Sequence, residues 1–275
     1  QELLKSPLVS VNGPPSSANG EIALYVACKF SQSKIVRCLL NHPQTDVNQS
    51  INDGSTPLHA CCEDHISTSS EILKLLLEHP DIDVDKINHR GFAPLHVATK
   101  NDKQKDFVTM LLDHPNIDVN VLAGGDQDHA QTALTLSCNC QNDADVTQLL
   151  AHKDIDVNCQ TPAGTPLSQS CELGLVKIVN ILIECPKIDF NKPSNKIFVG
   201  LRLTPLGIAL YNNIRKPDVK GVPAVILTLE QAICKKNVDV TFVWDVDEPM
   251  YVNSDFFRVL DQAETNFKRE PLVQA

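Results

Sequence analysis

Four histidines recur at nearly even intervals along this chain of 275 residues, and histidine is the side chain best suited to bind a metal or move a proton near neutral pH. They are His42, His79, His114 and His152, which we call the histidine ladder. Each ends an apolar run with helical spacing, so each should lie in the last turn of a helix and meet its free carbonyl groups. Packed helices lie roughly 8–10 Å apart, too far for two rings to share zinc with bonds of about 2.0–2.1 Å. We predict a structural role and no metal.

Two further histidines, His59 and His96, each follow a Pro-Leu pair. A general base needs a nucleophile or a carboxylate within reach in a pocket. The matching positions in other repeats hold Tyr25, Thr135, Ser168 and Gly207. Because no chemistry is repeated there, we predict that both rings bond to the local backbone and to the neighbouring repeat.

Five of the ten cysteines fall in the same short stretch of successive repeats: Cys28, Cys61, Cys62, Cys138 and Cys171. This pattern favours small buried residues at a tight helix contact. The pairs Cys61-Cys62 and Cys138-x-Cys140 lack a second pair at zinc-ribbon spacing, so we predict thiols in or near the core. We expect reduced thiols in an intracellular protein, cytoplasmic or nuclear. A metal or redox protein that uses the histidines and cysteines is the alternative.

The charge balance argues against several classes of function. The net charge of −10 repels phosphate backbones, and no basic stripe is visible, so we predict no nucleic-acid binding. No apolar run reaches the roughly 18 residues of a membrane span, so we predict no membrane. There is no glycine-rich phosphate loop, Gly-x-Ser-x-Gly or His-Glu-x-x-His motif. We therefore predict a protein that is not an enzyme and has no cofactor. Asp245, Asp247 and Glu248 form an acidic group that a solvated loop explains better than a cation or a basic partner.

The residues that carry these side chains are arranged as repeats. Asp-Val-Asn occurs at residues 46–48, 118–120 and 156–158, with variants at 83–85 and 189–191. Counted from Asn12, the intervals are 33 to 38 residues. A repeat of this length predicts stacked supersecondary units that share one elongated core.

The segment 50–85 shows how one unit should fold. Gly54 supplies a turn, and Thr56-Pro57 is a typical helix start, with Thr as N-cap and Pro in the first position. A short helix follows, and Ile72 to Leu77 predict a second helix with a wide apolar face. Pro80 should end that helix at His79.

The chain resembles ankyrin-repeat proteins, which carry Gly-x-Thr-Pro-Leu-His, an Ile-Val-x-x-Leu-Leu helix and Asp-Val-Asn. Here these motifs stand as Gly54-Ser55-Thr56-Pro57-Leu58-His59, Ile35 to Leu40 and Asp46–Asn48, and they recur in order through residues 1–191. The resemblance implies an all-α solenoid of stacked helix pairs with short β-hairpin fingers, and binding of another protein on the concave side. In this family pattern Ile22 and Ala93 replace the capping Thr, which should cost about 1 kcal/mol each.

On this reading the chain divides into eight segments. We expect a truncated tail at 1–12, repeats at 13–48, 49–85, 86–120, 121–158 with a long finger and 159–191, a divergent repeat at 192–241, and a capping segment at 242–275. In the divergent repeat we expect an enlarged loop at 192–203, an insertion at 212–223 and a second helix at 224–234. A capping helix is expected at 255–267. The half-repeat at the start predicts a fragment of a longer array.

By analogy with the family, the binding surface should be formed by the residues just before each helix start and just after each first helix. They are Asn52, Asp53, Ser55, Glu63, Asp64, His89, Arg90, Phe92, Lys100, Asn101, His129, Gln131, Asn139, Gln160, Thr161 and Glu172. Arg90 and Phe92 are the strongest candidates, because Arg and aromatic residues dominate binding energy. We predict a monomeric protein-binding scaffold. The alternative is the partner-targeting segment of a larger enzyme, such as a kinase or a ubiquitin ligase.

Three asparagines are candidates for enzymatic hydroxylation. Asn48, Asn120 and Asn158 each end Asp-Val-Asn and have Leu eight residues earlier, similar to the pattern modified in animal ankyrin repeats. The alternative is that these side chains only close a turn.

Overall fold

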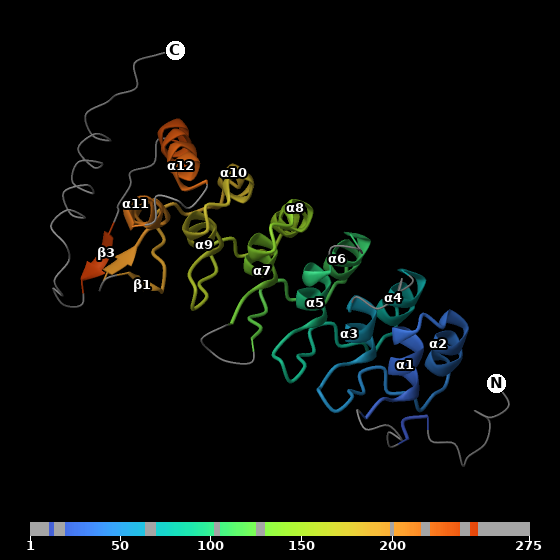
Figure 1. Ribbon diagram of the computed structural model, residues 1–275. Helices are drawn as coiled ribbons and strands as arrows, with labels where there is room; N and C mark the ends of the chain where they lie inside the picture. Colours follow the sequence, from blue (N-terminus) through green and yellow to red (C-terminus); the bar gives the residue numbers. More distant parts are fainter. Residues whose placement is uncertain are drawn as a thin grey trace. The chain divides into compact units, whose positions relative to one another are not determined.

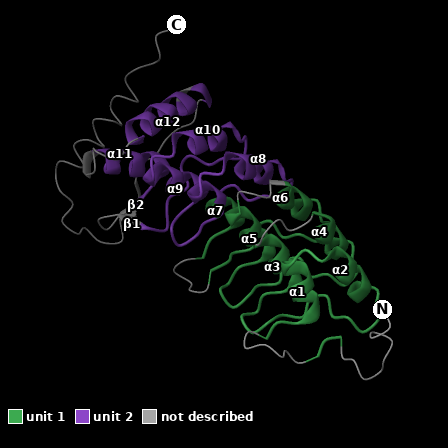
Figure 2. Cartoon of the chain, turned by 45° about the vertical axis from the view of Figure 1, so that its right-hand side comes forward, with its two compact units in different colours: residues 1–136 green, residues 137–275 purple. Residues whose placement is uncertain are grey.

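The apolar runs of the sequence form helices, and the helices come in pairs (Figure 1). The computed structural model describes residues 11–13, 20–63, 70–101, 105–124, 130–198, 201–215, 221–236 and 243–246. The chain divides into two units, residues 1–136 and 137–275, with the boundary inside α7 (Ala133–Asn139) (Figure 2). Each unit is described separately.

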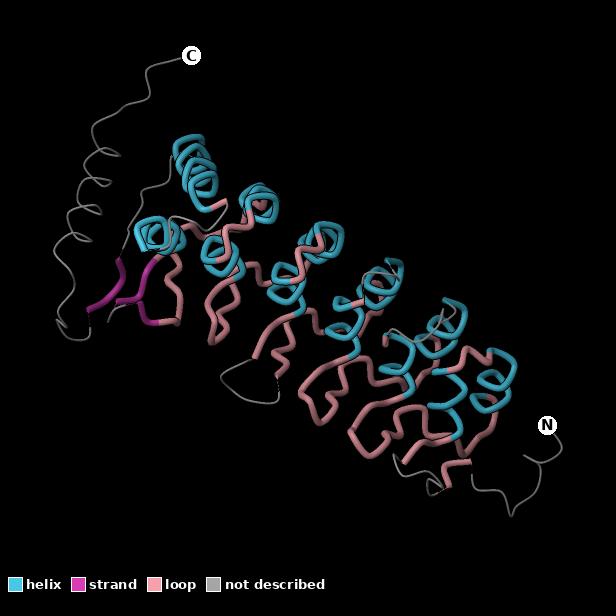
Figure 3. Tube along the Cα trace, in the orientation of Figure 1, coloured by secondary structure: helices cyan, strands magenta, loops and turns pink. Residues whose placement is uncertain are grey.

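The first unit contains three complete helix pairs. They are α1 (Ala23–Lys29) with α2 (Ser33–Leu40), α3 (Pro57–Cys62) with α4 (Ser70–Leu77), and α5 (Pro94–Lys100) with α6 (Lys105–Leu112). The first helices of the pairs pack on one another, and so do the second helices. We call them the inner and the outer helices. The loops before α3 and α5 project from the inner helices, away from the outer ones (Figure 3). We call such loops fingers and number them by helix pair, so the loop before α3 is the second finger and the loop before α5 is the third.

The predicted helix starts are confirmed at α3. Oγ1 of Thr56 accepts the backbone N–H of His59, and Pro57 occupies the first helical position. Ile22 and Ala93, at the same position before α1 and α5, give no side-chain cap. The polar cap is therefore missing at the two positions where the sequence lacks Thr.

The core of this unit is built from one row of leucines and one row of small residues. Leu58 and Leu76, from an inner and an outer helix, are completely buried. Cys28, Cys61 and Cys62 are also completely buried, so the predicted burial of these thiols is confirmed. Burial raises the pKa of the Cys61 thiol, which is also close to Cys28, and this keeps it protonated.

At the end of Asp-Val-Asn, the side-chain amides of Asn48 and Asn158 each join one repeat to the next. Asn48 donates through Nδ2 to the carbonyl of Asp81 at 2.6 Å and accepts the N–H of Asp83 at 2.9 Å. In the second unit Asn158 makes the same two bonds, to the carbonyl of Lys187 and the N–H of Asp189. We call this two-bond contact the amide staple.

Asp85 takes the place of the asparagine in one repeat and forms only half of the staple. Its Oδ2 accepts the N–H of Asp118 at 2.8 Å, but its buried Oδ1 has no hydrogen-bond partner. A carboxylate cannot donate the second bond. Burial is the main cause that raises the pKa of Asp85 to about 6, with smaller contributions from the charges of Asp118 and Asp83.

The histidine ladder lies just beyond the outer helices, not in their last turns as predicted. The helices before it end at Leu40, Leu77, Leu112 and Ala151. In each case Nδ1 of the histidine accepts the backbone N–H two residues later, at 3.2–3.3 Å. For three of the four, the proline that follows disfavours the helical state, which explains the earlier helix end. Each Nδ1 atom therefore closes a turn by accepting a hydrogen bond. It does not donate to a free carbonyl group of the helix.

The described part of the second unit contains two complete helix pairs, one further outer helix and a small sheet. The pairs are α9 (Pro166–Glu172) with α10 (Val176–Glu184), and α11 (Pro205–Arg215) with α12 (Val222–Lys236). The further outer helix is α8 (Asp143–Ala151), which follows α7. The strands β1 (Ile197–Phe198), β2 (Leu201–Leu203) and β3 (Val243–Val246) form an antiparallel sheet in that order.

The divergent repeat departs from prediction in its loops. The enlarged loop 192–203 ends in the β1–β2 hairpin, and β3 from the predicted capping segment pairs with β2. The helix expected at 224–234 is α12, and α11 extends to Arg215 into the segment expected as an insertion. Parts of several predictions lie outside the described residues: the tail 1–10, Asp64, His129, the helix 255–267, and Asp247 with Glu248.

We predict that Leu76→Ala costs about 2–5 kcal/mol of unfolding free energy, because it leaves a cavity between outer helices. Leu76 has no exposed surface, whereas His79 is half-buried and makes a single turn-closing bond. His79→Ala should therefore cost much less. Urea denaturation followed by circular dichroism measures both, and equal losses would show that the ladder has more than a turn-closing role.

We predict that Asp85→Asn raises the unfolding free energy by about 1 kcal/mol at pH 7, because the amide can donate the missing bond of the staple. An unfolded Asp has a pKa of about 3.9, below the folded value of about 6. The folded state therefore binds more protons in this window, and the stability that Asp85 contributes falls as the pH rises from about 4 through about 6. Asp85→Asn should remove this decline.

Asp81→Asn is the matched control, because it removes the same charge from an exposed residue of the same loop. Urea titrations at several pH values give the result. If the two variants behave alike across the pH range, the incomplete staple does not limit stability.

Candidate functional site

The fingers of the first unit are tight hairpins that support one another. The backbone N–H of Ile51 bonds to the carbonyl of Ser55, and that of Asn88 to the carbonyl of Phe92. Gly54 turns the second finger with a φ of +81°. A Cβ atom there would lie 2.7 Å from the ring of His89, because the fingers touch. The N–H of His89 also bonds to the carbonyl of Asp53 at 2.8 Å. Neighbouring fingers are therefore held at a fixed spacing.

His59 connects an inner helix to the next finger, as predicted. Its Nδ1 faces the N–H and the hydroxyl of Thr56, and its Nε2 lies 2.9 Å from the carbonyl of Phe92. A neutral ring with its proton on Nε2 satisfies both sides. Burial lowers the pKa of His59 and favours this neutral form.

His96 occupies the same position one repeat later but lacks one partner. Its Nε2 lies 3.2 Å from the carbonyl of Gln131, whereas its buried Nδ1 has no hydrogen-bond partner. Ala93 stands where Thr56 serves His59. Burial is the main cause that lowers the pKa of His96 to about 4, so the ring is neutral at pH 7. Both histidines are parts of the scaffold.

The predicted binding residues of the first unit differ in exposure. Asn52, His89, Arg90 and Lys100 are exposed, and Asp53, Glu63, Phe92 and Gln131 are half-buried. Together they form a surface of finger tips and helix ends, which we call the finger face.

Two of the predicted residues in this unit are corrected. Ser55 is completely buried, and its hydroxyl accepts a hydrogen bond from Asn88. Asn101 is buried, and its Nδ2 donates to the carbonyl of Cys62 at the end of the preceding inner helix. Both side chains stabilise the stack and cannot face a partner.

Phe92 is packed more closely than the sequence suggested. The Nζ atom of Lys100 lies 3.7 Å from the centroid of its ring, within cation–π range. The ring of His96 is 6.3 Å away on another side. The Phe92 ring is therefore half-buried, with the ammonium group of Lys100 over it, and the rest of the ring is accessible to solvent.

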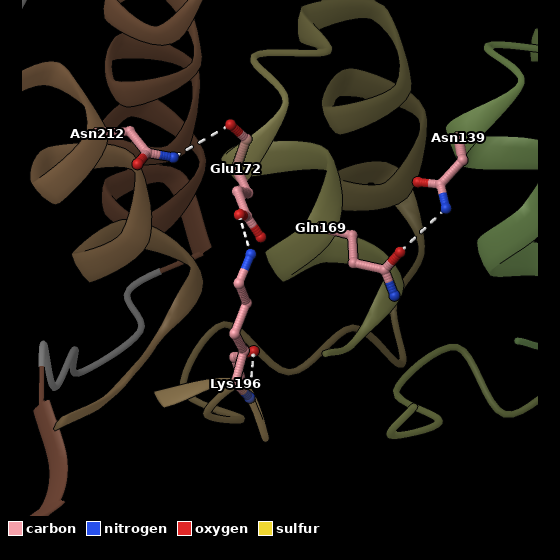
Figure 4. Close-up of polar contacts among 6 residues, drawn as sticks. Asn139, Gln169, Glu172, Lys196 and Asn212 are labelled. Carbon is pink, nitrogen blue, oxygen red and sulfur yellow. Dashed lines mark hydrogen bonds and ion pairs between the residues drawn. The ribbon is translucent and has the colours of Figure 1, made fainter. Parts of the chain in front are cut away.

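The polar groups of the second unit form their own network, which Figure 4 shows. In the figure Gln169 accepts a bond from Asn139. Gln169 also donates to Thr161 and to the carbonyl of Gly164. Glu172 pairs with Lys196, and its carbonyl accepts a bond from Asn212.

Of the residues predicted in this unit, Asn139, Gln160 and Glu172 are half-buried, and Thr161 is completely buried in its hairpin. Thr161 is therefore corrected from a surface residue to a structural one. Gln169, Lys196 and Asn212 were not predicted. The sequence offered one signal for Asn212, because it stands eight residues after Thr204 as Asn101 stands eight residues after Ala93. Both asparagines bond to the last carbonyl of the preceding inner helix.

The asparagines predicted as hydroxylation sites, Asn48, Asn120 and Asn158, are all half-buried. Asn48 and Asn158 use their side chains in amide staples. Their hydroxylation stays a prediction.

Within the described residues, no group of three or more His, Cys, Asp or Glu side chains could hold a metal ion. None of the described helices is long and apolar enough to cross a membrane. The thiol of Cys138 is buried, which raises its pKa to about 12. Cys140 is exposed, so of this pair only Cys138 lies in the core.

Comparison with known proteins identifies the repeats. Residues 1–87 and 24–123 match the family model of ankyrin repeats in three copies. Many solved structures share the fold. One is the crystal structure of the ankyrin repeat domain of Bcl-3, described as a unique member of the IkappaB protein family. It superposes with a TM-score of 0.63 over 78% of this chain and 87% of that chain, at 20% identity. No curated protein matches the sequence. The predicted fold class, an all-α solenoid of stacked helix pairs, is confirmed.

We predict that Ala93→Thr raises the unfolding free energy by about 1 kcal/mol, because it supplies the helix cap and a partner for Nδ1 of His96. Ala93→Ser, which adds the hydroxyl without the methyl group, separates the hydrogen bond from crowding at this buried position. Thermal and urea melts measure both variants. If neither stabilises the protein, the missing cap is not a weakness of this repeat.

Proposed function

Because this chain is an ankyrin-repeat protein, we propose that it binds another protein on the finger face of its first unit and performs no chemistry of its own. Ankyrin repeats are generally protein–protein interaction modules, and their fold is typically non-catalytic. The observation that carries the proposal is an exposed arginine beside an aromatic platform on fingers that are fixed to each other by backbone bonds.

The rigidity of the fingers supports this proposal energetically. A flexible loop loses conformational freedom when it binds, and that loss reduces affinity. Here the tip of one finger bonds to the next through His89 and Asp53, and His59 ties the base of the third finger to α3. Little further ordering is needed when a partner binds.

The two histidines support a binding role over a catalytic one. His59 and His96 are both buried, and burial lowers the pKa of each. Each uses Nε2 to contact a finger carbonyl. Their imidazole groups therefore position the fingers.

We predict that Arg90→Ala and Phe92→Ala each weaken partner binding by roughly 1 kcal/mol or more. Arg90→Ala should leave the melting transition nearly unchanged, because the side chain is exposed. Phe92→Ala should lower it modestly, because the ring is half-buried. A partner captured from cells and then purified gives the dissociation constants by calorimetry.

Lys74→Ala and Ile35→Ala are matched controls on the outer helices, where a cation and an apolar side chain are equally accessible. They should bind like the wild type. If the Arg90→Ala/Phe92→Ala double variant binds the partner as tightly as the wild type, the finger face is not the interface.

A further inference from the structure

The charges on the finger face of the first unit are sorted by repeat. Residues 49–63 contain Asp53 and Glu63 and no Lys or Arg. Residues 86–101 contain Lys86, Arg90 and Lys100 and no Asp or Glu. Lys86 bonds to the carbonyl of Asn48. Of the other charges, one in each repeat lies on the finger and one at the end of the inner helix. We call Asp53 with Glu63 the acidic column, and Arg90 with Lys100 the basic column.

The two columns lie next to each other and are tied at both ends. At the fingers, the N–H of His89 bonds to the carbonyl of Asp53 at 2.8 Å. At the helix ends, Asn101, which follows Lys100, bonds to the carbonyl of Cys62, which precedes Glu63. The distance between the two columns therefore equals the distance between the axes of packed helices, which is roughly 8–10 Å.

Arg90 is the part of the basic column that is open to a partner. Its side chain is exposed and makes no ion pair with a described residue. In the acidic column, one carboxylate oxygen of Asp53 accepts the N–H of Ser55 at 2.9 Å, which fixes its direction. The first repeat is different, because Glu21 and Lys29 form an ion pair at 2.9 Å and their charges cancel.

The charges of both columns act on one buried side chain, that of Tyr25. Burial raises the pKa of Tyr25, the charges of Glu63 and Asp53 raise it further, and Arg90 lowers it. An incoming charged group would meet both signs because the two columns lie next to each other. A uniformly acidic or uniformly basic segment would thus meet repulsion from one column.

We propose that the finger face binds a helical segment of a partner protein that carries an acidic and a basic side chain seven residues apart. This deepens the proposed function and rests on it. The acid pairs with Arg90 and Lys100, and the base pairs with Asp53 and Glu63. Residues seven apart in a helix lie on one face at about 10.5 Å, close to the separation of the columns. In an extended strand the same-face separations are about 7 or 13 Å, which fit less well.

Phe92 gives the segment an apolar contact on the basic side. When the two charges are seven residues apart, two residues between them lie on the same helical face. Each of these is three positions from one charge and four from the other. A leucine there can pack on the open part of the Phe92 ring. The recognised pattern is acid, leucine and base at spacings of three or four.

Synthetic helical peptides test this arrangement. The first has Glu and Lys seven residues apart, with Leu between them. The second has the same composition with Glu and Lys four residues apart. The third and fourth replace the pair by two Glu or two Lys. Compensating charges on the opposite face give all four a net charge of zero.

Fluorescence anisotropy at low salt should show that the first peptide binds about fivefold more tightly than each of the others, as expected from two exposed ion pairs. Arg90→Gln/Lys100→Gln and Asp53→Asn/Glu63→Gln should each remove most of that preference. Lys74→Gln on α4 should leave it unchanged. Equal binding of the peptides, no binding by any of them, or preference that survives both double variants overturns the proposal.

The same variants and peptides distinguish two other occupants of the finger face: a second copy of this chain, and a partner bound by another pattern. Sedimentation of the protein alone shows whether a second copy binds this face, and self-association that both double variants abolish would overturn the proposal. If peptide selectivity fails but partner capture still depends on Arg90 and Phe92, the finger face binds protein by another pattern. If selectivity holds and captured partners ignore Arg90 and Phe92, it is the proposed function that fails.

Discussion

The constraint on which this structure depends is that a single helix pair cannot bury its own apolar surface. Leu58 and Leu95, on neighbouring inner helices, are almost completely excluded from water. Because α3 packs between α1 and α5, its position fixes the position of the second finger. The spacing of the charged columns is therefore a consequence of core packing, not of the loops that carry the charges.

Polar contacts set the register that apolar packing leaves open. Apolar contacts are not directional, so they specify the register between neighbouring helices less strictly than hydrogen bonds do. The amide staples of Asn48 and Asn158 each require one particular N–H and one particular carbonyl of the next repeat. His59 does the same between α3 and the next finger. Asp85, His96 and Ala93 mark the positions in the first unit where one partner of such a contact is missing. We infer that stability is unevenly distributed among otherwise similar repeats.

Periodic features of the sequence were sufficient for the fold but not for the site. The apolar runs and the Thr-Pro starts predicted the helix pairs, because burial and capping are local properties of a segment. Thr161 was assigned to the surface wrongly, because its hydroxyl bonds to the carbonyl of Gly164 within its own hairpin. Ser55 and Asn101 were assigned to the surface wrongly, because each bonds to a group of a neighbouring repeat that only the folded stack brings near. The β1–β2–β3 sheet and Gln169 were missed for the same reason, since their partners lie far away in sequence.

We propose that partners bind the finger face and not the outer helices. Lysine acetylation measured by mass spectrometry, with and without a purified partner, tests it directly. Lys100 lies on the finger face, whereas Lys34 and Lys74 lie on outer helices, and all three are exposed in the free protein. We predict that the bound partner protects Lys100 and leaves Lys34 and Lys74 fully reactive. Protection of Lys34 and Lys74 with Lys100 unchanged would contradict it.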